Sequence, residues 1–334
     1  VFDHHQVQEA LYGGLSDLLR EEYHAAIADA LEVRTGHGGQ APIDQDGALC
    51  VDLCEHFLKG AVGESALRYL APALDHLDAG FLNDQAVDLI ERVLDEPGLC
   101  EGAARANLLL RRTELLDLLG RRDAQAAGLE EALALSSGMD DRSISMRVQR
   151  ALGHLRSRGN QHEQAMGHLE RSLEVARELR DQQAEVRATM SLGVVFHDLG
   201  RYEDAESHYE RALEIAREIG ARRSEARATG NLGNVFSHRG RPEEAQACHE
   251  RSLELATEIG DPRAIGTASG NLGNALRVQG RYEEALACQE RHLTTAREVG
   301  DRLAQAHAAK NLGDVLADLG RADAAQALYE ESLA

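Results

Sequence analysis

Apolar residues recur at helical spacing through most of this 334-residue chain. In residues 223–260 the apolar positions include Leu232, Val235, Phe236, Ala245, Cys248, Leu253 and Ala256. They fall at helical intervals of three, four and seven, which predicts two amphipathic helices. Gly240 suits the left-handed residue that ends the first helix, and Pro242 fits the first turn of the second. Gly260 should end the second helix, and Asp261 should cap the next one.

The same two-helix pattern returns every 40 residues. A Leu-Gly pair stands in the middle of each first helix: Leu152-Gly153, Leu192-Gly193, Leu232-Gly233, Leu272-Gly273 and Leu312-Gly313. Repeats of this length are typical of solenoids. We therefore predict an all-α, right-handed superhelical solenoid of antiparallel helix pairs, with about six repeats over residues 101–334 and essentially no β-strand. A glycine inside a helix costs about 1 kcal/mol relative to alanine, so we expect Gly233 to permit a close helix crossing that offsets the loss.

The first hundred residues do not follow the repeat. Residues 1–33 have a helical pattern of their own, and residues 34–46 hold three glycines and a proline, which predicts a flexible loop. Residues 47–100 form divergent helical hairpins in this interpretation, because the terminal repeats of an array are commonly irregular.

Charge and composition limit the classes of molecule that this chain is expected to bind. The formal net charge is −21, aromatic residues make up 4% and tryptophan is absent, which argues against binding nucleic acid or an anionic membrane surface. No apolar run reaches the length of a membrane span, and no signal-peptide pattern opens the chain. Five sparse cysteines without a secretion signal indicate reduced thiols and a cytoplasmic location.

Candidate chemistry is sparse. Cys50, Cys54 and His56 could suggest zinc, but no second close pair follows, so we interpret the two cysteines as buried small apolar residues and expect no metal. The histidines lack the neighbours that a catalytic group needs, and no phosphate-binding glycine loop is present. We therefore expect no catalytic residue, no cofactor and no enzyme activity in this chain.

The repeat resembles a known family. Leu192, Gly193, Phe196, Gly200, Ala205 and Tyr209 are similar to the signature of the tetratricopeptide repeat. The 40-residue period and the string NLGN resemble the Leu-Gly-Asn adaptors of spindle orientation and, more loosely, kinesin light chain. The resemblance implies that the first helix of each pair lines a concave groove, and that the chain binds a protein or a peptide.

The implied groove is basic and rich in amides. Its candidate binding residues are Arg147, Arg150, His154, Arg187, Arg227, Asn231, Asn234, Asn271, Asn274, Arg277 and Asn311. An asparagine can donate and accept hydrogen bonds, so a ladder of them could pair with the backbone of any extended peptide, and arginines would favour an acidic one. Hydrogen bonding between helices is the other interpretation of the asparagines. On the second helices, glutamate rows such as Glu206 and Glu210 should face water.

The amino-terminal segment carries a second resemblance. Residues Phe2, His4, Glu9, Tyr12, Arg20, His24 and Ala28 are similar to the segment that closes the ATPase module of bacterial STAND-type signalling ATPases. That module also occurs fused to Ser/Thr kinases. The resemblance implies that this chain is the C-terminal part of such a bacterial signalling protein, with any nucleotide site before Val1.

Three functions remain open. The first is a regulatory scaffold or sensor region that binds an extended peptide or protein segment in the groove. The second is an autoinhibitory or oligomerisation brace for an upstream ATPase or kinase, which an exposed apolar stripe on the outer helices would favour. The third is a small-ligand sensor.

Overall fold

The computed structural model describes residues 12–34 and 46–333, and within them it contains sixteen α-helices, α2 to α17, and no β-strand. The predicted all-α solenoid of antiparallel helix pairs is confirmed. The chain forms two compact units that divide after Leu108, inside α6, whereas the sequence suggested a boundary near residue 100. Residues 35–45, most of the predicted loop, and Phe2, His4 and Glu9 lie outside the described residues.

The first unit begins with α2. Its helices are α2 (Asp17–Arg34), α3 (Gly47–Lys59), α4 (Gly63–Ala79), α5 (Asn83–Asp95) and the start of α6 (Gly102–Leu118). Helix α2 packs on α3, and α3 packs on α4. The Tyr12 hydroxyl lies 2.7 Å from Nε2 of His24, whose Nδ1 lies 2.8 Å from Nδ1 of His56. The histidine pair therefore joins α2 to α3, a contact that the sequence pattern does not predict.

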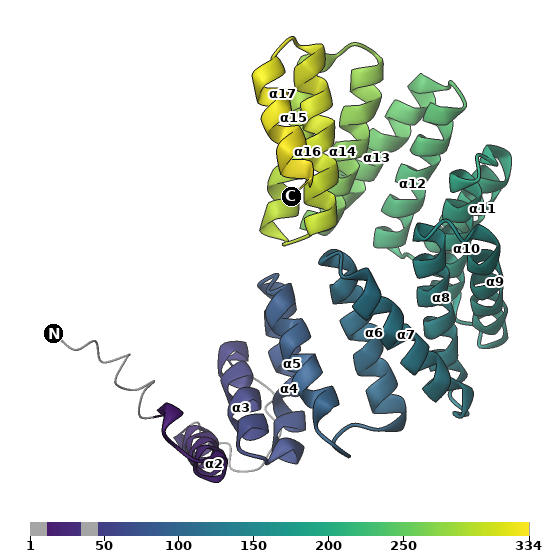
Figure 1. Ribbon diagram of the computed structural model, residues 1–334. Coiled ribbons are helices and arrows are strands. Elements are labelled where there is room, and N and C mark those ends of the chain that lie inside the picture. The colour runs from purple at the N-terminus through teal and green to yellow at the C-terminus, as the bar shows by residue number, and fades with distance from the viewer. Residues whose placement is uncertain (1–11, 35–45, 334) are drawn as a thin grey trace. The chain divides into compact units, whose positions relative to one another are not determined.

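The second unit holds the rest of α6 and eleven further helices (Figure 1). They are α7 (Arg122–Ser137), α8 (Arg142–Arg158), α9 (His162–Glu178), α10 (Gln182–Asp198), α11 (Tyr202–Glu218), α12 (Arg222–His238), α13 (Pro242–Ile259), α14 (Pro262–Val278), α15 (Tyr282–Glu298), α16 (Arg302–Asp318) and α17 (Ala322–Leu333). From α8 onward each even-numbered helix packs against the next odd-numbered one, forming a pair.

The helix boundaries follow the local signals in the sequence. Gly240 and Gly260 both adopt φ +70°, a left-handed conformation that glycine reaches without a steric penalty. Pro242 opens α13, and the carboxylate of Asp261 accepts a hydrogen bond from the Arg263 backbone nitrogen at 3.1 Å. Asn160, which replaces glycine in its copy, also has positive φ, as asparagine tolerates better than most residues. These predicted caps are confirmed.

Each mid-helix glycine makes room for a particular side chain. A Cβ added at Gly233 would lie 2.5 Å from the His249 ring, and one at Gly193 would lie 2.6 Å from the Tyr209 ring. The other three copies behave alike, with Gly153 under Leu169, Gly273 under Gln289 and Gly313 under Tyr329. The partner always stands sixteen residues later, on the second helix of the pair. The close crossing predicted at Gly233 is thus filled by a side chain, whose identity varies from repeat to repeat.

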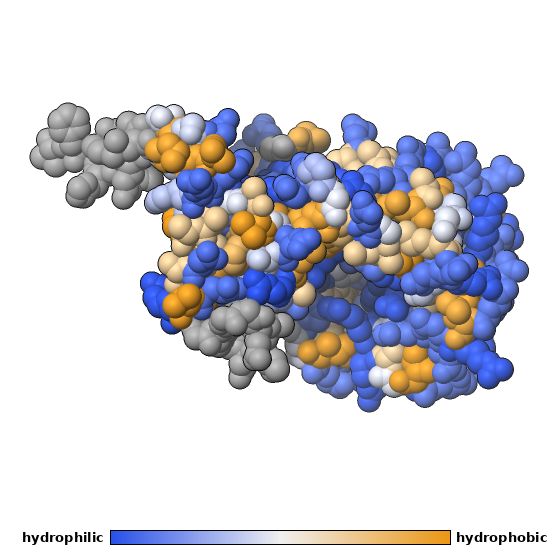
Figure 2. Space-filling view, turned by 90° about the horizontal axis from the view of Figure 1, so that it is seen from below, coloured by the Kyte–Doolittle hydropathy of each residue, from blue (hydrophilic) through white to orange (hydrophobic). Residues whose placement is uncertain are grey.

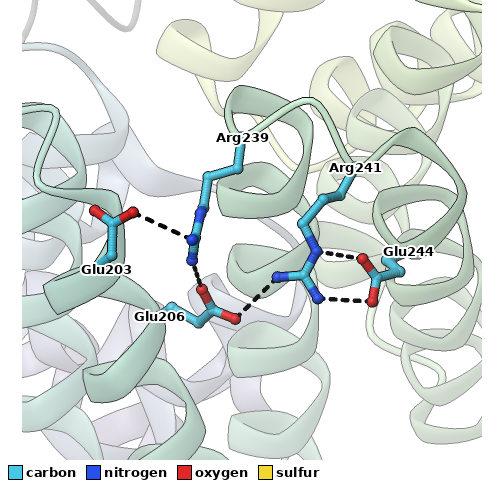
Figure 3. A network of polar contacts seen from close by, with 5 residues as sticks. All are labelled: Glu203, Glu206, Arg239, Arg241 and Glu244. Carbon is cyan, nitrogen blue, oxygen red and sulfur yellow. Dashed lines mark hydrogen bonds and ion pairs between the residues drawn. The ribbon is translucent and has the colours of Figure 1, made fainter.

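Arginines at the turns connect successive repeats (Figure 3). Glu206 accepts a hydrogen bond from Arg239 and lies 3.2 Å from Nη1 of Arg241. Arg241 also pairs with Glu244, and Arg239 lies 3.2 Å from Glu203. Only 17% of the Glu206 side chain is exposed, so the prediction that this glutamate faces water is wrong. The next member of its row, Glu210, is exposed as predicted.

Candidate functional site

The first helices of the second unit form one continuous surface. Helix α8 contacts α10, α10 contacts α12, α12 contacts α14, and α14 contacts α16. The second helices of these described pairs make no comparable approach to one another. Elements on the inner side of a curved array lie closer together than those outside, so the first helices line the concave side. We call this the inner surface.

Three arginines of the inner surface have no acidic partner. Arg150 on α8, Arg187 on α10 and Arg227 on α12 make no side-chain ion pair or hydrogen bond with any residue that the structure describes. Arg227 is exposed, while Arg150 and Arg187 are partly exposed. We call these three residues the arginine cluster.

Two members of the cluster line a cavity of about 220 Å³. Its wall is formed by α6, α7 and α8, and Arg227 reaches it from α12, across the intervening α10. The predicted residues Arg147 and His154 also line it. Curvature of the array therefore brings together side chains that are almost two repeats apart in sequence.

Acidic residues at this cavity come from α6. Asp117 forms an ion pair with Arg158, which lies at the end of α8. Glu114 is exposed and makes no ion pair within the described chain, although its charge favours the charged form of Arg150. Of the two carboxylates at the cavity, that of Asp117 is therefore in an ion pair and that of Glu114 is not.

His154 is held neutral at the cavity. Its Nε2 lies 2.9 Å from Oγ of Ser191, and that hydroxyl donates its proton to the Arg187 backbone oxygen at 2.8 Å. His154 must then donate through Nε2, which leaves Nδ1 unprotonated. Burial, reinforced by the charges of Arg150 and Arg227, lowers the pKa of His154 to about 3. Ser191 was not among the predicted residues, although it stands 37 residues after His154 on the next first helix.

The environment of the cavity also lowers the pKa of two guanidinium groups. Loss of solvent between the groove walls lowers the pKa of Arg150 and of Arg227, and Arg187 lowers both further by charge repulsion. Because the ordinary pKa of an arginine lies far above neutrality, both groups remain charged at neutral pH. The cluster is therefore a concentration of positive charge that the described residues do not neutralise.

The asparagines form a second part of the inner surface. The side chains of Asn231, Asn234, Asn271 and Asn311 are partly exposed and make no hydrogen bond to the described residues. Asn274 differs, because its Oδ1 accepts a hydrogen bond from Nε2 of Gln289 at 2.8 Å. Bonding between helices therefore accounts for Asn274 but not for the other four, whose amides remain open.

The inner surface is not basic along its whole length. Arg277 lies 2.5 Å from Asp318 and 3.8 Å from Asp314, and Lys310 lies 3.0 Å from Asp314. These ion pairs occupy Arg277, which the sequence grouped with the candidate binding arginines. The unpaired positive charge is confined to α8, α10 and α12.

Comparison with known families identifies the repeat. The tetratricopeptide repeat model matches residues 185–258 and 264–334. These residues are similar to tetratricopeptide repeats. They include α12, α14 and α16, whose inner faces carry the open asparagines. A search of curated proteins found no match.

Solved structures share the fold of the repeats. A Rap protein complexed with competence and sporulation factor aligns over 98% of this chain and 96% of its own, with TM-score 0.60 and 13% identity. NprR in complex with its cognate peptide NprX aligns over 80% of this chain and 76% of its own, with TM-score 0.54 and 18% identity. A STAND protein with a tetratricopeptide repeat sensor from Pyrococcus horikoshii aligns over 93% of this chain but 46% of its own, with TM-score 0.56 and 14% identity.

The remaining candidate chemistry lies outside the repeats. Cys50 and Cys54 are buried, and burial raises the pKa of the Cys54 thiol to about 12. None of the five cysteines forms a disulfide bond within the described residues. The described residues contain no group of three or more histidine, cysteine or acidic side chains arranged to hold a metal ion. In the same part of the chain, no helix is long and apolar enough to cross a membrane.

Proposed function

We propose that this chain is a peptide-binding scaffold whose inner surface holds an extended segment of a protein partner. The observation that carries the proposal is the row of open amides on successive first helices. Asn231, Asn271 and Asn311 occupy equivalent positions 40 residues apart. An amide that has no intramolecular partner can pair with a peptide backbone, which offers a donor and an acceptor at every residue.

The spacing of the row suits an extended chain. Packed helices lie about 8–10 Å apart, and an extended peptide rises about 3.3 Å per residue. Successive asparagines in the row should therefore meet every third residue of the bound peptide. The three positions together span about 20 Å, or about six residues.

The solved structures support a peptide or protein partner. NprR was crystallised with its cognate peptide, and the STAND protein carries its tetratricopeptide repeats as a sensor. Together with the resemblance of the amino-terminal segment to STAND proteins, they support a regulatory role in a bacterial signalling protein. The proposal includes that role and assigns no reaction to this chain.

A brace function finds less support. The exposed large apolar residues of the second unit are Leu179, Leu199, Ile259, Val278 and Leu333. Each stands at the C-terminal end of a helix, so they form no stripe along the outer helices. Figure 2 likewise shows apolar residues in scattered groups among hydrophilic ones on the visible face. In the first unit, α2, with Leu18 at 65% and Tyr23 at 53% exposure, offers an apolar face for such a contact.

The proposal can be tested without knowing the partner. A display library of random 12-residue peptides is selected against the whole chain, and the selected peptides are measured by calorimetry. Each hydrogen bond contributes about 1 kcal/mol, so Asn231→Ala combined with Asn271→Ala should weaken binding about 30-fold. The loss should be similar for peptides of unrelated sequence, because the bonds are to the backbone.

The control variant is Gln164→Ala, which removes an exposed amide from the second helix α9. It should leave the affinity unchanged. No enriched peptide, or enriched peptides that bind the double asparagine variant as tightly as the parent, would move binding away from the inner surface. The brace function, tested by deleting the apolar side chains of α2, would then lead.

A further inference from the structure

The arrangement of the arginine cluster indicates a specific binding site in addition to a general attraction for acidic peptides. Arg150, Arg187 and Arg227 stand on three successive first helices, and two of them face one cavity. Side chains of like charge repel, so a folded protein gains nothing by gathering three of them without acidic partners. Elsewhere on the inner surface the arginines are paired, as Arg158 is with Asp117 and Arg277 is with Asp318.

The charge at the cavity can be counted. The cluster contributes three positive charges, two from Arg150 and Arg227 in the cavity wall and one from Arg187, which acts on both of them from outside the wall. Glu114 contributes the one carboxylate of the wall that has no ion pair. His154 contributes none, because it is neutral. About two positive charges are left without compensation in a concave, partly dry place, where a charge interacts more strongly than in open water.

The cavity also has the right size and donors for a compact anion. Its volume of about 220 Å³ is several times the share of one water molecule, which is about 30 Å³. A guanidinium presents a fork of N–H donors that matches the oxygens of phosphate and carboxylate groups. Arg150 and Arg227 approach the cavity from different helices, so they can hold one anion from two sides.

We propose that this cavity binds the phosphate monoester of a phosphorylated residue within the peptide that occupies the inner surface. This inference rests on the function proposed above. A phosphate monoester carries about −1.5 to −2 charges at neutral pH and three acceptor oxygens, which matches the two uncompensated positive charges. A single carboxylate would leave one of them unpaired, so a glutamate or aspartate of the partner is the poorer ligand.

The arrangement predicts where the phosphate lies relative to the amides. The cavity is bounded by α8 and α12, and the asparagine row begins on α12 with Asn231. A phosphorylated residue in the cavity would place the adjoining stretch of the peptide over that row. The phosphate would then fix the register of a backbone that the asparagines grip without regard to sequence.

Three degenerate peptide libraries test the inference. They share eleven positions and differ only at the central residue, which is phosphoserine, serine or glutamate. Binding of each fluorescent library to the whole chain is followed by anisotropy. We expect the phosphoserine library to bind at least tenfold more tightly than the serine library, with the glutamate library between them. Equal affinity of the phosphoserine and serine libraries would overturn the inference.

Arginine variants locate the effect. Arg150→Gln and Arg227→Gln should each remove most of the preference for phosphoserine over serine. Arg171→Gln is the matched control, because Arg171 is an exposed arginine on α9 that makes no ion pair with the described residues. It should retain the full preference. A preference that persists in both cluster variants would place the phosphate elsewhere.

The folding of the variants is part of the test. Removing one of several mutually repelling charges should not lower the melting temperature, so a loss of binding in Arg150→Gln or Arg227→Gln is not a loss of structure. A nuclear magnetic resonance titration of the arginine Nε–Hε groups with inorganic phosphate gives an independent readout. Signals of Arg150 and Arg227 should shift and that of Arg171 should not, and unshifted cluster signals would count against the site.

Competition with free O-phosphoserine separates this inference from the function proposed above. If the amino acid displaces the phosphoserine library with the affinity of the whole peptide, the cavity is a small-molecule phosphate site and the peptide proposal fails. If the serine library binds through the asparagines and phosphate adds nothing, the peptide proposal stands and the phosphate site fails. If no library binds, both fail.

Discussion

Replacing Gly193 by alanine tests whether the mid-helix glycine exists to seat the side chain sixteen residues later. A Cβ at this position would lie 2.6 Å from Cε1 and 2.8 Å from Cδ1 of Tyr209. Ordinary van der Waals contact begins near 3.4 Å. The Tyr209 ring is 2% exposed and packs in a cluster with Val186 and Ala212, so it cannot move aside into solvent.

Two opposing terms set the size of the effect. Overpacking a tight core costs about 1–3 kcal/mol, while alanine favours a helix interior over glycine by about 1 kcal/mol. We therefore expect Gly193→Ala to destabilise the protein by about 0–2 kcal/mol. Gly167 of α9 provides the control, because a Cβ there would meet nothing within 4 Å. Gly167→Ala should stabilise by about 1 kcal/mol.

Urea unfolding followed by circular dichroism measures both variants against the parent. The reasoning further requires that Gly193→Ala become favourable once the ring is removed, so it is repeated in a Tyr209→Ala background. The sign of its effect should reverse there. If Gly193→Ala raises the urea midpoint as much as Gly167→Ala does in the parent, the ring does not constrain the glycine and the packing argument fails.

Other predictions concern acid, ion pairs and thiols. His249 is 1% exposed, and burial lowers its pKa to about 4 from an ordinary 6.5, so the unfolded chain takes up the proton first as the pH falls. Stability should therefore fall between these two pH values in urea titrations, and less so in His249→Gln, which copies Gln289 of the next repeat. Glu206→Gln should lower stability by about 1–2 kcal/mol, because it weakens contacts to two arginines. Glu203→Gln, whose side chain is 76% exposed, should stay within about 0.5 kcal/mol, and equal urea midpoints would contradict this difference. A thiol reagent added to denatured protein without reductant should react with five cysteines, and a lower number would reveal a disulfide.

The sequence predicted those parts of the fold that local chemistry determines. A glycine that must adopt positive φ, such as Gly240, and an aspartate that caps a helix, such as Asp261, act within a few residues. The period then places the same signals 40 residues apart. The contact of His24 with His56 could not be predicted in this way, because it joins helices that follow no repeat.

Side-chain contacts between successive repeats recur at a fixed separation in the sequence. Arg158 bonds to Asp117, Ser157 to Asp198 and Arg277 to Asp318, each pair being 41 residues apart. A separation of 41 residues is one repeat plus one residue, which places the two side chains side by side on successive first helices. Read this way, the sequence alone would have indicated that Arg277 is paired.

The same regularity explains why the arginine cluster is unpaired. The positions 41 residues before and after Arg150 are leucine and serine, those of Arg187 are methionine and alanine, and those of Arg227 are valine and alanine. The separation of 37 residues, seen between His154 and Ser191, offers these arginines no acid either. In a chain with a net charge of −21, acids are abundant, yet none stands at either separation from the cluster, and Glu114, whose charge favours the charged form of Arg150, makes no ion pair with it. The residues at these two separations therefore leave the arginine cluster without an ion pair. A ligand that supplies the missing negative charge is the simplest explanation of such a cluster.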